Sequence, residues 1–351
     1  MKEIKTKKEA HMKTDMFWWP KIDLHHHLEG SIRTKTYIEL MKERGLDKKI
    51  RIPMDDEKWL ERLLIVGPHD EGDFHWCLSK FHWLRFAVAD KEAISRLVFE
   101  AIEDSAADNV KYLELRISPG PLLEKGISEA DIISGIEEGW ALGEKKTGIR
   151  VGIIAGITRE QPIEYAERVV DLAIKGMDKG IRGIDLLSDE SYPPELFKDV
   201  YLRAERAGLF RTVHAGEYGG TKNVITAVEE LHANRLGHGT NIYRDDPIAG
   251  MRAVLDHDVH IECNLSTNVA VGNIRNVSEH PIKRMMSDGI SVNINTDDPV
   301  QSNVVLSREY TYARDEIGIT EEQLKAMTLR TLDHIFRPEL KEELRKVFIF
   351  D

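Results

Sequence analysis

Eight short β-rich segments, most of them followed by a helical pattern, restrict the fold of this chain more than any other feature. Several of the segments are apolar nearly throughout, which is typical of strands covered on both faces. The predicted strands are Lys21–Leu24, Val110–Ser118, Ile149–Ile157, Ile181–Leu187, Leu209–His214, Arg235–Gly239, Val259–Leu265 and Ile290–Asn295. This alternation predicts an α/β fold, a (β/α)8 barrel of the TIM type.

Helical patterns fill the intervals between the later strands. They cover Glu129–Lys146, Pro162–Lys175, Pro194–Ala207, Lys222–Ala233, Asp246–Asp256 and His280–Asp288. After the eighth strand, a helical region of some 50 residues ends with Lys341–Val347. The sequence therefore predicts extra C-terminal helices beyond the eight-strand unit.

One connection is unusually long, because about 85 residues separate the first predicted strand from the second, and those at about 31–108 form the expected insertion. It contains a helix-like stretch, Thr36–Arg44, and an aromatic-rich segment, Asp73–Phe86. An insertion at the carboxyl ends of barrel strands is placed to cover a pocket. The aromatic residues of this expected lid are Phe74, Trp76, Phe81 and Trp83. The alternative is the apolar face of an ordinary amphipathic helix.

No linker divides the rest of the chain, so residues 21–351 are expected to form a single hydrolase barrel domain. Residues 1–20 are expected to be an N-terminal extension; the first 14 carry five lysines without an apolar core, unlike a signal peptide. No run of about 18 apolar residues occurs, so no membrane-spanning helix and no membrane partner are expected.

The chain is acidic, with 49 Lys and Arg against 61 Asp and Glu, a formal charge of −12. This charge disfavours nucleic acid as a partner and fits a small neutral or cationic molecule. The only cysteines, Cys77 and Cys263, do not form a disulfide framework, so a reducing, cytoplasmic location is expected. The oligomeric state is left open by the sequence.

Four polar motifs lie at the ends of predicted strands, where barrel enzymes build their active sites. Side chains alternate along a strand, so His25 and His27 point the same way and can bind one metal ion. His214 ends the fifth strand, His238 lies between two glycines, and Asp297 adjoins a second carboxylate. Taken singly, each motif has a structural alternative: a polar strand end, a helix start, a satisfied core histidine, or an Asx turn.

Together the motifs predict a metal-dependent hydrolase. The expected ligands of one divalent ion, most simply Zn²⁺, are His25, His27, His214 and Asp297. Such an ion lowers the pKa of bound water toward ~7, and His238 is placed to take the proton. Glu217 is expected to protonate the leaving region, and Asp298 to orient a substrate. This set describes hydrolysis at an electron-poor carbon.

The motifs KIDLHHHLEGSI, VHAGE, RLGHGT and INTDDP, in this order, resemble the adenosine deaminase family of metal-dependent amidohydrolases. The resemblance extends from Lys21 to the C-terminal helices. It implies the same four metal ligands, with Glu217 as proton donor to purine N1, His238 as the base that activates water, and Asp298 at N7. The implied reaction is attack at C6 and loss of ammonia, which converts adenosine to inosine, with 2′-deoxyadenosine as a further candidate substrate.

Two positions depart from the family pattern and leave the substrate open. Glu29 stands where relatives that act on adenosine usually carry Asp facing the ribose hydroxyls, and Glu is common there in relatives that act on adenine. Ser188 replaces a glycine whose backbone N–H contacts purine N3. The spacing from Asp185 to Glu190, in contrast, is similar to that of adenosine deaminases. Adenine and a 5′-modified adenosine therefore remain alternative substrates.

Three other classes of protein fit the sequence less well. A binuclear barrel hydrolase commonly needs a lysine at the end of strand four, and this strand ends Leu186-Leu187-Ser188. A non-catalytic nucleoside-binding relative would be expected to have lost a catalytic residue, and none is missing. The zinc site of cytidine deaminases needs a PCxxC motif, which the chain lacks.

Overall fold

The computed structural model describes residues 16–67, 70 and 73–350. The lysine-rich start of the expected N-terminal extension lies outside them. Just before the first strand, the side chains of Met16 and Trp19 are buried. Lys21 Nζ donates hydrogen bonds to the carbonyl oxygens of these two residues, at 3.4 and 2.8 Å. The short segment that enters the barrel is thus packed against it.

Eight parallel strands follow one another around the sheet in chain order, which confirms the predicted barrel. They are β1 Lys21–His27, β2 Val110–Ile117, β3 Arg150–Thr158, β4 Ile181–Leu187, β5 Phe210–Ala215, β6 Arg235–His238, β7 His260–Cys263 and β8 Val292–Ile294. The seam between β1 and β8 is closed just beyond β8. There Asp297 N donates to His25 O and His27 N donates to Asp297 O, each at 2.8 Å.

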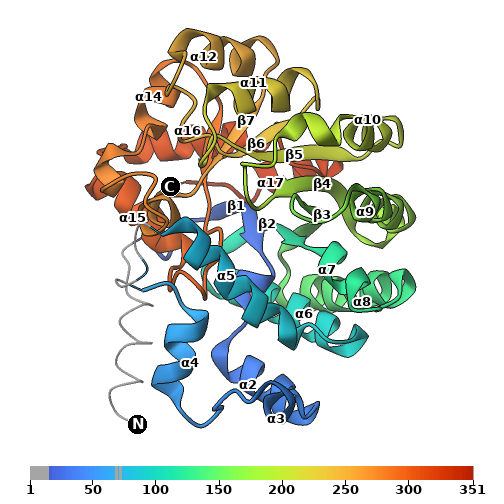
Figure 1. Cartoon of the computed structure of the whole chain (residues 1–351). Helices are drawn as coiled ribbons and strands as arrows, with labels where there is room; N and C mark the ends of the chain where they lie inside the picture. The colour runs from blue at the N-terminus through green and yellow to red at the C-terminus, as the bar shows by residue number, and fades with distance from the viewer. Residues whose placement is uncertain (1–15, 68–69, 71–72, 351) are drawn as a thin grey trace.

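Helices surround the barrel and cover one of its ends (Figure 1). The insertion contains α2 Thr34–Glu43, α3 Leu46–Ile50, α4 Glu57–Leu64, α5 Phe74–Leu84 and α6 Lys91–Ala107. Between the later strands lie α7 Pro119–Glu124, α8 Glu129–Thr147, α9 Ile163–Lys175, α10 Lys198–Arg206, α11 Thr221–Glu229, α12 Pro247–Asp256, α13 Leu265–Ala270 and α14 Ile282–Ser287. The predicted C-terminal helices are α15 Leu306–Asp315, α16 Glu321–Thr331 and α17 Lys341–Arg345.

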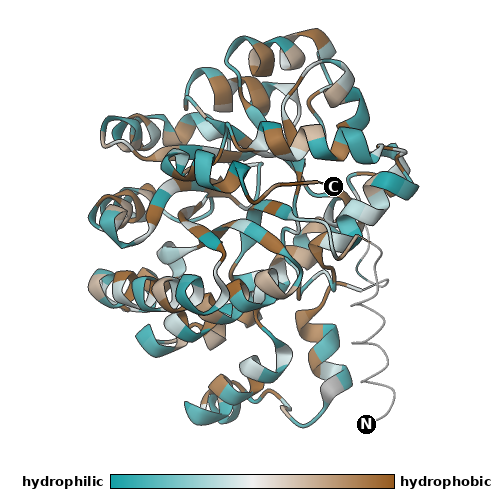
Figure 2. Cartoon of the chain, turned by 180° about the vertical axis from the view of Figure 1, so that it is seen from behind, coloured by the Kyte–Doolittle hydropathy of each residue, from teal (hydrophilic) through white to brown (hydrophobic). Residues whose placement is uncertain are grey.

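The outer helices are amphipathic, and Figure 2 shows hydrophobic and hydrophilic residues mixed along them. Helix α8 shows how the sequence sets such an element. Its first turn is capped by Ser128, whose Oγ accepts from Asp131 N at 3.1 Å, and its C-cap is Gly148 with φ +78°.

None of the described helices combines the length and hydropathy that crossing a membrane requires.

Three glycines let α8 pack closely against α6. Gly135, Gly139 and Gly143 recur every four residues, so they lie on one face of the helix. A Cβ on Gly139 would come within 2.4 Å of Ser95 O on α6, and one on Gly143 within 2.6 Å of Ile102 Cδ1. These contacts place α6 in the outer helical layer immediately before β2.

Strand β7 ends earlier than its apolar pattern predicts. The segment Val259–Leu265 was expected to be extended throughout, but the strand stops at Cys263. Asn264 turns the chain, and Leu265 begins α13 with its side chain still buried. The apolar run in this segment therefore shows which residues are buried, whereas the end of the strand is set by its pairing with the neighbouring strands.

Candidate active site

The four predicted metal ligands meet at the carboxyl end of the barrel. His25 and His27 lie on β1, His214 on β5 and Asp297 just after β8, and all four are buried. One ligand atom of each lies within 4.8 Å of the others. His25 Nε2 and His27 Nε2 are 3.1 and 3.3 Å from Asp297 Oδ1. Three imidazoles and a carboxylate at this spacing fit a single divalent ion.

Two buried carboxylates fix the orientation of two of these imidazoles. Glu262 Oε2 lies 2.7 Å from His25 Nδ1, and Asp185 Oδ1 lies 3.1 Å from His214 Nδ1. If each Nδ1 donates its proton to its carboxylate, each Nε2 keeps a lone pair for a metal ion. This arrangement is the second observation that favours a metal site at the cluster.

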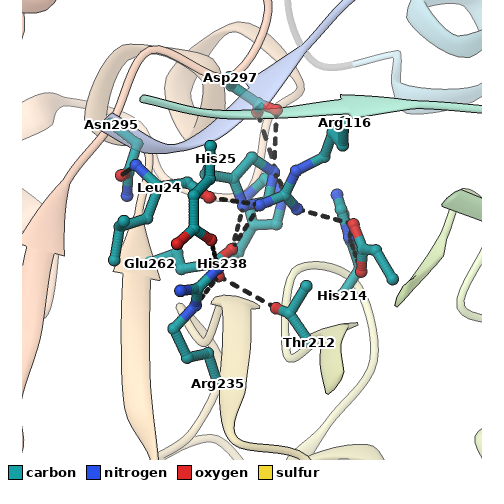
Figure 3. Close-up of polar contacts among 12 residues, drawn as sticks. Leu24, His25, Arg116, Thr212, His214, Arg235, His238, Glu262, Asn295 and Asp297 are labelled. Carbon is teal, nitrogen blue, oxygen red and sulfur yellow. Dashed lines mark hydrogen bonds and ion pairs between the residues drawn. The ribbon is translucent and has the colours of Figure 1, made fainter. Parts of the chain in front are cut away.

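Arg116 joins the two carboxylates from β2. Its Nη1 lies 2.7 Å from Asp185 Oδ2, and its Nη2 lies 2.9 Å from Glu262 Oε2 (Figure 3). Deeper in the barrel, Arg235 Nε donates to Glu262 Oε1 at 2.7 Å and Arg235 also pairs with Glu114. All these side chains are fully buried, so each charge depends on its partners inside the barrel.

Glu217 is held over the barrel by the loop that follows β5. The carboxylate of Glu190 accepts the backbone N–H groups of Gly216, Glu217 and Tyr218 at 3.0, 2.7 and 2.9 Å. The Glu217 side chain is itself buried, and burial, together with the negative charges of Asp297 and Glu190, raises its pKa well above the usual range. A carboxyl group in this state keeps a proton that it can donate at neutral pH.

His238 lies at the end of β6 in a left-handed conformation, with φ +66°. A Cβ on the preceding Gly237 would come within 2.8 Å of His25 Cε1, so glycine is required beside the cluster. His238 Nε2 lies 3.6 Å from Glu217 Oε2 and 3.9 Å from Asp297 Oδ2. Burial lowers the pKa of His238 well below its usual value, so the imidazole is neutral and can accept a proton.

Asp298 points into the pocket without a partner for one of its oxygens. Its Oδ1 is buried and makes no hydrogen bond to the described part of the chain. Burial, followed by the charge of Asp297, raises the pKa of the Asp298 carboxyl well above its usual range. A Cβ on Gly30 would come within 1.9 Å of Oδ1, so Gly30 makes room for this side chain. An unpaired buried carboxyl oxygen is a natural contact for a bound substrate.

A single pocket gathers the other predicted site residues around the cluster. It is lined by His27, Glu29, Ser188, His214, Glu217, His238, Asp297 and Asp298, together with residues of α5 and the neighbouring loops. His25 lies behind this lining and is fully buried. Every site residue expected from the sequence is therefore at the pocket or directly beneath it.

Helix α5 covers the pocket, but only part of its aromatic set faces inward. Phe74 and Phe81 line the pocket with Cys77 and Leu78, a spacing that follows one helical face. Trp76 and Trp83 lie on other faces of the helix and do not line it, so the expectation for these two residues is wrong. Phe74 stacks on Tyr218 at 4.2 Å between ring centroids, which ties the helix to the Glu217 loop.

The two positions that depart from the family pattern have clear local roles. Glu29 Oε1 accepts a hydrogen bond from Ser118 N at 2.9 Å. Ser188 has φ +83°, a conformation that favours glycine, and its Oγ donates to Glu160 Oε1 at 2.6 Å. Ser188 thus keeps the backbone shape expected of a glycine while its side chain bonds away to Glu160.

Sequence reasoning missed Glu262 and Arg116, and it treated Asp185 and Glu190 only as parts of a substrate motif. A signal was present, because Arg116 and Glu262 are charged residues inside segments predicted to be strands of the barrel. A buried charge on a strand needs a partner. The partners lie on other strands, 69 and 146 positions away in the case of Arg116, and cannot be read from one segment.

Comparison with known proteins agrees with this site. The family model described as adenosine deaminase matches residues 20–347. An adenosine deaminase of Clostridium acetobutylicum is 31% identical over 91% of this chain and 94% of its own.

Two solved structures have the same fold. An amidohydrolase of Burkholderia ambifaria with bound Zn is 27% identical, with a TM-score of 0.84 over 95% of this chain and 90% of its own. An N6-mAMP deaminase of Arabidopsis is 26% identical, with a TM-score of 0.80 over 95% and 98%. The chain therefore belongs to the adenosine deaminase family and is a hydrolytic deaminase that acts on C–N bonds.

Proposed function

We propose that the protein deaminates adenosine to inosine and ammonia, with 2′-deoxyadenosine as a second nucleoside substrate. The observation that carries the proposal is the placement of the Glu217 carboxyl and the His238 imidazole, 3.6 Å apart, beside the ligand cluster. The relatives named adenosine deaminase support it. One molecule of water is consumed for each ammonia released.

We propose Zn²⁺ as the ion, held by His25, His27, His214 and Asp297. The donor set and the zinc in the Burkholderia ambifaria relative support this choice. A bound divalent ion supplies Lewis-acid activation of water. His238 accepts a proton at Nε2, and Glu217 donates its proton to purine N1.

The remaining pocket residues are proposed to orient the substrate. Asp298, whose Oδ1 has no partner in the described structure, contacts purine N7. Ser188 offers its backbone N–H to N3, and Glu29 faces the ribose hydroxyls. We propose a small purine nucleoside as the substrate and no nucleic acid partner.

Two further proposals concern the chain as a whole. Residues 21–351 form a single domain, supported by the uninterrupted barrel and the helices packed around it. A cytoplasmic location is supported by Cys77 and Cys263, both of which are free thiols.

Ultraviolet absorbance of the zinc-loaded protein with adenosine, and separately with adenine, tests the function, since conversion of a 6-amino purine to the 6-oxo form changes its spectrum. We expect turnover of adenosine. Turnover of adenine alone would mean that Glu29 fills the sugar site, and silence on both would refute the proposal for unmodified substrates.

The matched control is Glu217→Gln, which keeps the size of the side chain and removes its proton. We expect this variant to lose several orders of magnitude in kcat while still binding metal. A variant with near-normal kcat would remove Glu217 from the donor role.

A second candidate is adenosine modified at its 5′ position. The Arabidopsis relative, described as an N6-mAMP deaminase, favours it by its name. Arg85, which lines the pocket, also favours this candidate.

A further inference from the structure

Arg85 is a cation of the active-site pocket that no group in the described part of the chain neutralises. It follows α5 directly and continues the pocket-lining face of Phe74, Cys77, Leu78 and Phe81. Its Nε is buried without a hydrogen-bond partner in the described structure. The guanidinium also makes no ion pair with any described residue. By contrast, buried Arg116 and Arg235 each pair with two carboxylates.

Arg85 lies at the Glu29 end of the pocket. Lys125 Nζ donates to Arg85 O at 2.6 Å, which fixes the chain at this point. Burial, followed by the positive charge of Arg85, lowers the pKa of Lys125 to about 8, and the negative charge of Glu29 acts in the opposite direction. Both residues therefore lie near the same ammonium group. Glu29 is the residue proposed above to face the ribose, so Arg85 borders the sugar side of the pocket.

The charge of the lining makes an unpaired arginine informative. Four carboxyl groups line the pocket, those of Glu29, Glu217, Asp297 and Asp298, and none pairs with Arg85. Apart from the metal site, Arg85 is therefore the cation of this lining that a negatively charged 5′ substituent can bind. Neutral adenosine offers no charge to a guanidinium, whereas a phosphate or carboxylate matches its fork of donors.

We propose that Arg85 binds an oxyanion on the 5′ side of the ribose, so that the preferred substrates are 6-aminopurine nucleosides whose 5′ substituent carries a phosphate or carboxylate group. The inference rests on the proposed function and narrows its substrate class. Two sources share this chemistry: a 5′-phosphate, as in AMP, and a carboxylate on a 5′ thioether, as in S-adenosylhomocysteine.

The test compares kcat/KM for adenosine, AMP and S-adenosylhomocysteine in the zinc-loaded wild type, Arg85→Met and Arg85→Lys. Arg62→Met is the matched control, because Arg62 is an exposed arginine of the same insertion. We expect the wild type to prefer at least one anionic substrate over adenosine by about tenfold or more. Arg85→Met should lose about 10- to 100-fold on that substrate, as for a charge-assisted hydrogen bond, and about twofold or less on adenosine.

The outcomes separate the possible sources. A loss confined to AMP identifies the phosphate, and a loss confined to S-adenosylhomocysteine identifies the carboxylate. Arg85→Lys should retain part of the preference because it keeps the charge without the fork. Equal changes on all three substrates, or the same change in Arg62→Met, would overturn the proposal.

A binding measurement keeps the inference separate from the proposed reaction. Calorimetric titration with IMP and with inosine needs no turnover and compares a phosphate with a hydroxyl at the same position. If no nucleoside is deaminated, the proposed function fails, but a ratio of IMP to inosine affinity that falls in Arg85→Met still supports the oxyanion site. A ratio unchanged by the substitution would refute a phosphate site, and S-adenosylhomocysteine titrated against adenosine decides the carboxylate in the same way.

Discussion

Glu262→Gln is the change that tests the buried network most directly. The carboxylate accepts from His25 Nδ1 at 2.7 Å, Arg116 Nη2 at 2.9 Å and Arg235 Nε at 2.7 Å (Figure 3). It is fully buried, so no solvent replaces these contacts. A glutamine offers one acceptor oxygen and turns a donor NH2 toward the remaining donors.

Glu262→Gln is expected to lower both the stability of the fold and the affinity for metal. Breaking a buried ion pair by removing one partner destabilises by about 3–5 kcal/mol. Arg116 keeps Asp185 and Arg235 keeps Glu114, so the lower end, about 3 kcal/mol, is expected. His25 also loses the acceptor that orients it, which should weaken metal binding by about 10- to 100-fold.

Urea unfolding of the metal-free protein measures the stability, and competition with a chelator of known affinity measures the metal affinity. The matched control, measured at pH 5, is Glu309→Gln, the same substitution at a buried carboxyl on α15 that bonds Ser266 N at 3.1 Å and lies outside the network. The prediction is refuted if the free energy of unfolding of Glu262→Gln falls by less than about 1 kcal/mol and its metal affinity stays within about twofold of the wild-type value.

Three further predictions follow from other sites. Gly30→Ala should lower kcat/KM by about 100-fold or more with metal still bound, because the new Cβ would lie 1.9 Å from Asp298 Oδ1 and displace that carboxyl. Near-normal kinetics would exclude a contact between Asp298 and the substrate. Ser188→Gly should raise the free energy of unfolding by about 0.5–1 kcal/mol, because φ +83° strains a serine. If urea unfolding shows instead that the variant is less stable by that amount, the hydrogen bond from Ser188 to Glu160 contributes more than the strain. Burial raises the pKa of Glu309 from 4.5 to about 7. The folded state then keeps a proton that the unfolded state releases, so this carboxyl destabilises the fold increasingly from pH 4.5 to 7, by up to about 3 kcal/mol. Glu309→Gln should therefore be more stable than wild type at pH 8 and similar to it at pH 5, and equal differences at both pH values would contradict that pKa.

The barrel could be predicted because its signals are local. Strand β4 spans Ile181–Leu187 as the apolar pattern predicted, and the metal ligands follow strands whose carboxyl ends meet at one end of the barrel. Side-chain alternation placed His25 and His27 on the same face without knowledge of any neighbour. These inferences needed only the period of a strand and the shared direction of parallel strands.

The network and the lid could not be predicted in the same way. Arg116 and Glu262 are 146 positions apart, and their pairing depends on the register of strands that do not adjoin in sequence. For α5, composition indicated an aromatic lid, but only helix rotation decides that Phe81 faces the pocket and Trp83 does not. That no described residue pairs with the Arg85 guanidinium is likewise a property of the packed molecule.

The seam between β1 and β8 has a consequence for how this molecule comes together. The two halves of the chain each carry two ligands: β1 holds His25 and His27, while His214 and Asp297 come from the second half. Across the seam, Leu24 N donates a hydrogen bond to the side-chain Oδ1 of Asn295, 271 positions away in the chain. A nascent chain therefore lacks a complete metal-binding set until its last strand has been synthesised. Two separately made half-barrels, divided after β4, would report their own reassembly by regaining the ability to bind the ion.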